Sequence, residues 1–171
     1  MRLLFGQDRD VAHWVAQHIP HMAIRIPDFG YGETFGMGAA IGVIDSEGVL
    51  AGGVVYHNYD PYCRSMELSC ASTTPRWLTR EIVGGLLRYP FLQANCQRLT
   101  SVTPRRATST RRLLEGLGFR REGSIRRGFG DDNAIVYGLL AEDWAAHRLS
   151  QPRRGSLTDE QEKRPISAAA A

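Results

Sequence analysis

The sequence predicts a mixed α/β domain with one central, mostly antiparallel sheet. In the first third of the chain, apolar runs separated by short turns are typical of antiparallel hairpins. After residue 65, strand-like and helix-like segments alternate, which indicates helices packed on a sheet. The unit formed by strand 65–73, helix 75–91 and strand 98–103 should hold its two strands parallel, joined by a right-handed crossover. A chain of 171 residues is about one domain long.

The first half of the chain is interpreted as a strand, a helix and an antiparallel meander. Asp8 or Asp10 would cap the first helix, and Ile19-Pro20 would end it. The expected segments are a strand at 2–5, a helix up to 18, a mobile loop rich in glycine and aromatic residues at 27–38, strands at 39–44 and 49–57 around the turn 45–48, and a strand at 65–73 after the turn 58–62.

The second half begins with a helix signal. Thr74 precedes Pro75, so the hydroxyl would cap a helix whose first residue is the proline and which runs to Phe91. Gly118 would end a later helix. The remaining expected segments are a strand at 98–103, a helix at 108–117, a hairpin of 124–127 with 134–140, and a short helix at 142–149.

Composition places the chain among globular proteins. Hydrophobic residues make up 43% and charged residues 23%, which excludes collagen-like and globally disordered classes. No apolar run reaches membrane-spanning length, and the first twenty residues lack a signal-peptide pattern, so a cytoplasmic protein is expected. Three cysteines without CxxC spacing disfavour a disulfide framework or a zinc site. No metal is expected at His13, His18 and His21, whose spacing fits one helix and its end.

Basic charge is concentrated between residues 98 and 127, a segment that contains nine arginines and two glutamates. Such a block fits a polyphosphate ligand, nucleic acid or a solvated helix face. Two or three of its arginines would contact a phosphate in the first case, and the others would be solvated. The arginines concerned are the pairs Arg105/Arg106, Arg111/Arg112, Arg120/Arg121 and Arg126/Arg127.

The most specific pattern is TSTRRLLEGLGFRREG at 108–123, followed by DDNAIVYGLL. With the order of elements, it resembles the GNAT N-acetyltransferase superfamily, most closely the RimJ/RimL-like branch and similar phage and prophage proteins. The resemblance covers about residues 1–149, so we expect an acetyltransferase-like domain at 1–149 and a flexible tail at 150–171. The residues that carry it are Leu113, Leu114, Gly118, Phe119, Glu122, Gly123, Arg126, Tyr137 and Gly138.

The resemblance implies that strands 65–73 and 98–103 splay apart and hold acetyl-CoA as co-substrate. Backbone groups that lack a neighbouring strand would pair with the pantetheine amides, and the next helix would offer N–H groups to the pyrophosphate. Cys70, Ala71 and Ser72 would meet the pantetheine. Arg76 and Arg80, one helical turn apart, would face the phosphates. The full set expected around the phosphates is Arg76, Trp77, Leu78, Thr79 and Arg80.

The sequence departs from the family in two places. Thr79 and Glu81 stand where the phosphate loop usually has small residues. In the later helix, the usual Asn-x-x-Ser/Ala is replaced by Ala107 and Thr110, so Thr110 is the polar contact offered to the cofactor. These changes leave phosphate binding to the helix terminus and the arginines.

The implied reaction is direct attack of a primary amine on the thioester, which needs a base and an oxyanion donor. Glu67 is the first candidate base because it alternates away from core residues on its strand, and His57 is the second. Backbone N–H groups near Cys70 would bind the oxyanion. Leu114 occupies the position where many relatives have a tyrosine acid, which leaves Tyr56 or Tyr137 to reach the site. Cys70 itself is not expected to act as a nucleophile.

The acceptor would enter between segments 25–37 and 125–137, and would be a protein N-terminus or side chain rather than a small molecule. Carboxylates there would attract its ammonium group. Two alternatives stay open: a non-catalytic binding or structural module with the same fold, and a basic protein associated with nucleic acid. The oligomeric state is open, and a homodimer is compatible with the sequence. The acceptor carboxylates are Asp28, Glu33, Asp131 and Asp132.

Overall fold

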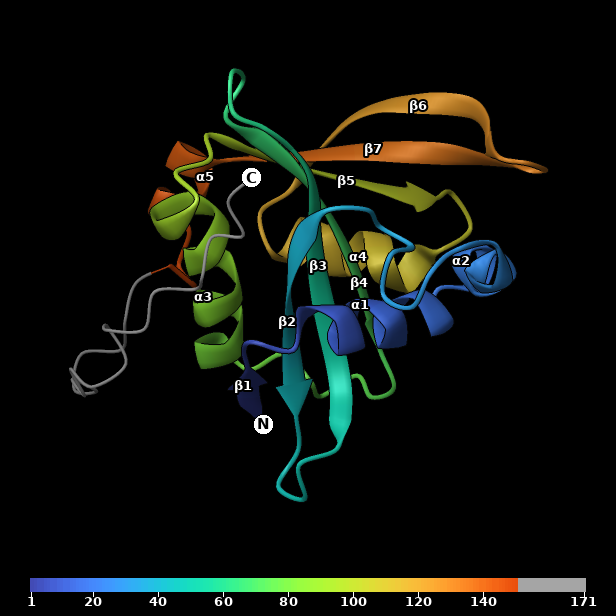
Figure 1. Ribbon diagram of the computed structural model, residues 1–171. Helices are drawn as coiled ribbons and strands as arrows, with labels where there is room; N and C mark the ends of the chain where they lie inside the picture. The colour runs from blue at the N-terminus through green and yellow to red at the C-terminus, as the bar shows by residue number, and fades with distance from the viewer. Residues whose placement is uncertain (151–171) are drawn as a thin grey trace.

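The computed structural model describes residues 1–150. Apart from Ser150, the tail predicted at 150–171 lies outside the described residues. The described residues form one seven-stranded sheet (Figure 1), and the predicted mixed, mostly antiparallel α/β class is confirmed. Across the sheet, the strands are β1 (Arg2–Leu4), β2 (Gly38–Ile44), β3 (Leu50–Asp60), β4 (Ser65–Ser72), β5 (Arg98–Pro104), β7 (Asp132–Leu140) and β6 (Arg120–Phe129).

The sheet consists of two leaves joined along one short seam. The seam is the parallel pair β4–β5, which begins at Ser65–Arg98 and ends at Glu67–Thr100. Beyond it, β4 stays paired with β3, and β5 stays paired with β7 as far as Pro104. Figure 1 shows the antiparallel strands β2 and β3 aligned near the vertical, with β5, β7 and β6 lying across them. The two strands of the seam therefore diverge while each leaf remains intact.

Helices cover both faces of the sheet. α1 (Asp8–Gln17) buries Val11 and Val15 against β2 and β3 on one face. The other face carries the larger core, to which α3 (Arg80–Arg88), α4 (Thr108–Gly116) and α5 (Ala141–Ala146) contribute. Three short helical segments complete the described part: α2 (Pro20–Ala23), η1 (Ile26–Asp28) and η2 (Tyr89–Gln93).

The predicted cap of the first helix is wrong. Gln7 is the capping residue, and its side chain makes no capping hydrogen bond. Asp8 lies in the first turn, where its Oδ1 accepts a hydrogen bond of 2.7 Å from the backbone N–H of Ala40. The carboxylate is still close to the helix N-terminus, where negative charge is stabilising. Its hydrogen bond links α1 to the edge of β2.

The predicted start of α3 is also wrong. The helix begins at Arg80, capped by Thr79, whose hydroxyl accepts from the N–H of Ile82 at 3.3 Å. A helix from residue 75 would place Trp77 on the polar side with Glu81, because residues four apart share a face. Instead, the chain stays irregular and Trp77 is buried at 4% exposure. Since Arg76 lies in the loop, it and Arg80 are not neighbours on one helix face.

Other element boundaries shift without changing the order. β3 runs through Asn58, which has a positive φ of 52°, and includes most of the predicted turn. β6 begins at Arg120, four residues earlier than predicted, and α5 ends at Ala146. Gly118 ends α4 as predicted, with a φ of +95° and the paired hydrogen bonds of a Schellman motif.

Candidate active site

The two candidate bases meet where the seam ends. His57 on β3 is the register partner of Glu67 on β4, and Glu67 is the partner of Thr100 on β5. Directly paired residues project from the same face of a sheet, so the three side chains form one row across three strands. Met66 and Leu68 are buried on the opposite face. The half-buried carboxylate of Glu67 therefore stands at the fork between the diverging strands.

His57 is held in place by two neighbours. Its Nε2 lies 3.0 Å from the hydroxyl of Ser69, and its ring centroid is 5.2 Å from that of Phe35. Burial lowers the pKa of His57 below its ordinary value, and the negative charge of Glu67 opposes this shift without cancelling it. The ring is therefore neutral at pH 7 and able to accept a proton.

The lowered pKa of His57 predicts a pH dependence of stability. As the pH falls below about 6.5, the unfolded chain gains a proton at this ring before the folded protein does, so folding stability is lost. We expect His57→Gln to lose less unfolding free energy between pH 7.5 and 5.5 than the wild type. Urea unfolding at both pH values measures the two losses. The pKa of His21 is also lowered, but its contribution to the loss of unfolding free energy is the same in both proteins and cancels in the comparison. Equal losses would contradict the assignment to His57.

An ion pair borders the row on the β6 side. Arg98 donates through both terminal nitrogens to the carboxylate of Glu122, and its Nε lies 3.2 Å from the hydroxyl of Thr100. A Cβ on Gly138 would lie within the space that the Glu122 carboxylate occupies. Hydrogen bonding from Arg98 lowers the pKa of Glu122. The Glu122 carboxylate therefore lies over β7 at Gly138, where a side chain on residue 138 would block it.

The opposite face of the fork is apolar. A cavity of about 30 Å³ lies between α3 and α4, with Leu68 and Cys70 of β4 in its wall. Burial raises the pKa of the Cys70 thiol to about 11, which leaves it protonated at pH 7 and agrees with the expectation that it is no nucleophile. Ala71 projects to the other side of β4, toward the α1 cluster, and Ser72 is exposed at the end of the strand.

The two tyrosines considered as proton donors to sulfur are already engaged. The hydroxyl of Tyr56 donates to the carbonyl oxygen of Leu86 at 2.7 Å. Tyr137 is fully buried, and its hydroxyl donates to Glu115 at 2.7 Å while accepting from Nε of Arg111. Leu114, which the resemblance places where relatives have a tyrosine acid, belongs to the core. These contacts give both tyrosines a role in packing the helices on the sheet.

The loop 73–79 at the wide end of the fork separates the predicted phosphate contacts. Arg76 is exposed, whereas the Trp77 ring packs on Gly52, where a Cβ would lie 2.3 Å from Cε3 of the ring. Leu78 packs against the larger core and Thr79 caps α3. Arg80 donates to the carbonyl oxygen of Arg148. Thr110 is half-buried in the first turn of α4.

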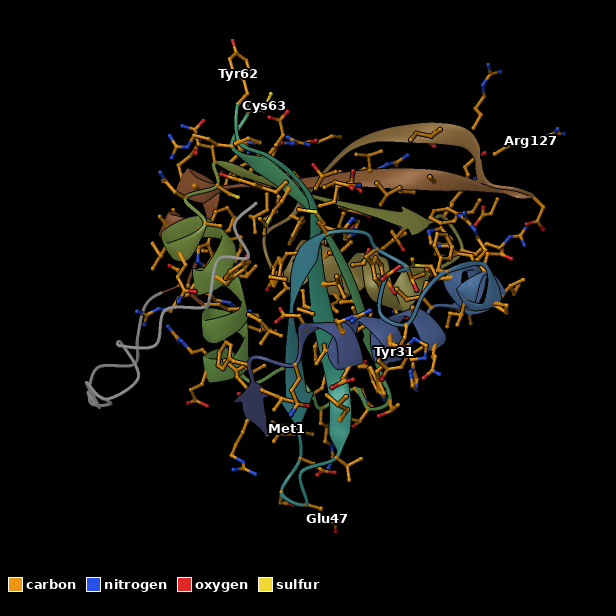
Figure 2. All side chains as sticks on the ribbon, viewed as in Figure 1. Met1, Tyr31, Glu47, Tyr62, Cys63 and Arg127 are labelled. Carbon is orange, nitrogen blue, oxygen red and sulfur yellow. The ribbon has the colours of Figure 1, made fainter. Side chains whose placement is uncertain are left out.

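The glycine-rich segment before β2 is irregular, as expected, but several contacts restrain it. Tyr31 lies beside α1 (Figure 2). Its hydroxyl donates to Asp10 at 2.9 Å, and its ring centroid lies 4.2 Å from that of His13. Arg9 donates to the carbonyl oxygen of Tyr31 and pairs with Glu33 at 3.3 Å. These contacts anchor the segment to α1, whereas the sequence predicts a mobile loop.

Most of the acids predicted to attract an ammonium group are paired. Glu33 is bound to Arg9, while Asp131 and Asp132 both face Arg106, at 3.0 and 3.9 Å. Of the four, Asp28 is the one that forms no ion pair within residues 1–150. Arg105, Arg106 and Arg111 line a cavity of about 400 Å³ together with Asp131, Asp132 and Asn133.

Sequence reasoning missed Ser69, Phe35, Thr100 and the Arg98–Glu122 pair. The alternation of β4 was a usable signal for Ser69, which stands two residues from Glu67. The other contacts depend on strand register. Among residues 1–150, no three His, Cys, Asp or Glu side chains gather as metal ligands do. No helix in this part of the chain is long and apolar enough to span a membrane.

Comparison with known proteins gives structural matches alone. No family model and no curated protein matches the chain. A chimera of the Vibrio cholerae spermidine N-acetyltransferase SpeG and hSSAT superposes with a TM-score of 0.68 at 16% identity, over 85% of this chain and 98% of that one. The ribosomal-protein-S5-alanine acetyltransferase of Vibrio fischeri gives 0.62 at 15% identity, over 83% and 93%.

A dodecameric spermidine N-acetyltransferase from Vibrio cholerae gives a TM-score of 0.59 at 17% identity, over 67% of this chain and 75% of that one. Identities this low establish the arrangement of the chain and not its substrate. The sheet order and the diverging parallel pair are thus those of the GNAT acetyltransferase fold.

Proposed function

We propose that the protein is an acetyl-CoA-dependent N-acetyltransferase that acts on a primary amine, with a protein N-terminus or side chain preferred over a small molecule. The observation that carries the proposal is the seam, which ends at Glu67–Thr100 while both strands continue beyond it. Part of the backbone of 68–72 and 101–104 faces the opening without a strand partner. Amide groups of this kind suit the amides of pantetheine.

The residues at the mouth of the fork suit the phosphates. Arg76 supplies an exposed cation in the loop 73–79, and α3 presents its N-terminus directly after it. The first-turn N–H groups of a helix lack intrahelical partners, so they favour an anion. Trp77 would contribute through its backbone, since its ring is buried.

In the proposed reaction, Glu67 accepts the proton of the acceptor's ammonium group. The freed lone pair forms the N–C bond to the thioester carbonyl carbon, and the C–S bond breaks. Sulfur leaves as a thiolate, and the second proton lost by the nitrogen of the tetrahedral intermediate passes through solvent to this thiolate. Backbone N–H groups of β4 near Cys70 would stabilise the oxyanion. Neutral His57, beside Glu67 in the same row, offers a second proton acceptor.

The proposal is tested by titrating the protein with acetyl-CoA and with CoA in a calorimeter. We expect micromolar binding by the wild type, and an affinity about tenfold lower or worse for Arg76→Ala, because a charge-assisted contact to phosphate is lost. Arg2→Ala, on the outer strand β1, is the matched control and should bind as the wild type does. Absence of binding at millimolar acetyl-CoA would overturn the proposal.

A further inference from the structure

The face of the sheet that carries Glu67 continues into an apolar floor. Thr100 pairs with Gly138, and two residues along β5, Val102 pairs with Val136. Paired residues share a face, so Val102 and Val136 lie on the side of Glu67. On β6, Ile125 is the partner of Ala134, which is two residues from Val136 and projects from the same face. Three strands thus contribute aliphatic side chains beside the fork.

This floor is open to solvent. Val102 is 39% exposed and Ile125 is 52% exposed, while Val136 between them is half-buried. Figure 1 shows the β6–β7 hairpin projecting beyond the other strands. The floor extends about 7 Å along β5 from Thr100, and two strand spacings of about 4.8 Å across. These dimensions suit one or two residues of a peptide, or a short alkyl chain.

The other carboxylates around the floor are already paired with arginines. Glu122, at the border with the fork, is bound by both terminal nitrogens of Arg98. Asp131 and Asp132, at the far end of the hairpin, pair with Arg106. Glu67 forms no ion pair within residues 1–150. A single carboxylate at the fork followed by aliphatic surface matches one positive charge followed by an apolar group.

We propose that the acceptor carries one ammonium group next to an apolar substituent, and that Val102 and Ile125 select such amines against polyamines. This inference rests on the proposed acetyl transfer. A polyamine bound by one end at Glu67 would place its next ammonium group over the floor. Desolvating that charge on aliphatic side chains without a carboxylate partner is unfavourable. An uncharged apolar chain in the same place gains free energy by burial.

The test compares hexylamine, a peptide with an N-terminal leucine and no other charge, and spermidine as acceptors. We expect kcat/KM for the first two to exceed that for spermidine by about tenfold or more, the discrimination that a small apolar contact area supports. Val102→Asp and Ile125→Asp should lower kcat/KM for hexylamine and raise it for spermidine. Val49→Asp is the matched control, since Val49 is a 57% exposed valine beside the β2–β3 turn. Preference of the wild type for spermidine would overturn the proposal. Loss of spermidine turnover in Asp28→Asn would also overturn it, because Asp28 would then be a carboxylate partner for the second ammonium group.

A second readout needs no turnover. Methyl NMR spectra of the CoA-saturated protein are recorded during titration with hexylamine, and the resonances of Val102, Val136 and Ile125 are expected to shift. Unshifted methyls at saturating hexylamine would overturn the inference even if acetyl-CoA binds. Failure of the proposed acetyl transfer is seen separately, as absence of acetyl-CoA binding in the calorimeter.

Discussion

Glu67→Gln is expected to lower kcat for acetyl transfer on the order of 10²-fold or more, the usual contribution of a positioned general base. The substitution keeps the shape of the side chain and removes its ability to take the ammonium proton. The loss should shrink as the pH rises toward the pKa of the acceptor amine, because a free amine needs no base. Initial rates measured from pH 6 to 10 with one acceptor give both results.

Two comparisons separate this role from others. Glu47→Gln, in the turn between β2 and β3 at the far end of the sheet (Figure 2), should leave kcat unchanged. Acetyl-CoA affinity should be the same in the wild type and both variants. If the loss at Glu67 stayed constant over the whole pH range, the carboxylate would act by orienting the amine rather than by removing its proton.

Trp77→Ala is expected to destabilise the protein by about 3–5 kcal/mol, the range for removing a large buried aromatic ring. Trp77 is 4% exposed, and its ring lies on Gly52 of β3. Because Trp77 also anchors the loop that carries Arg76, the variant should bind acetyl-CoA more weakly than its loss of stability alone explains. Chemical denaturation and calorimetry below the unfolding transition measure the two effects.

The partner glycine provides an internal control for this prediction. Gly52→Ala in the wild type forces a Cβ to within 2.3 Å of the ring and should cost about 1–3 kcal/mol, typical of overpacking. In the Trp77→Ala background, the same methyl group enters the space left by the ring, so its cost should vanish. Additive effects of the two substitutions would show that the ring and the glycine are not in contact.

The order of elements could be predicted from the sequence because each strand and helix carries a local pattern. Apolar runs and turns indicate the hairpins, and Gly118 ends its helix where a left-handed residue is required. The start of α3 could not be predicted in this way. Thr74-Pro75 and Thr79 are both good local caps, and the burial of Trp77 against Gly52, a contact across 25 residues of chain, decides between them.

The candidate site shows the same division. Strand alternation predicts Glu67 as a base, and the near-neutral pKa of a histidine side chain favours His57. The register of β3 and β4 places the two together. The pairing of Asp131 and Asp132 with Arg106 could not be predicted, since 25 residues or more separate the partners. The acceptor side therefore carries far less free negative charge than its count of acids suggests.

The short seam also affects which unpaired strand edges the protein exposes to other chains. A sheet has two outer edges, and unpaired strand edges invite association with foreign strands. Here β1 has three residues, and β6 carries four arginines that disfavour a second strand. The diverging stretches of β4 and β5 add two inner edges, enclosed by the strands themselves and flanked by α3 and α4. In the proposed complex, a narrow, extended ligand would pair with these inner edges, which lie apart from the two outer edges where foreign strands associate.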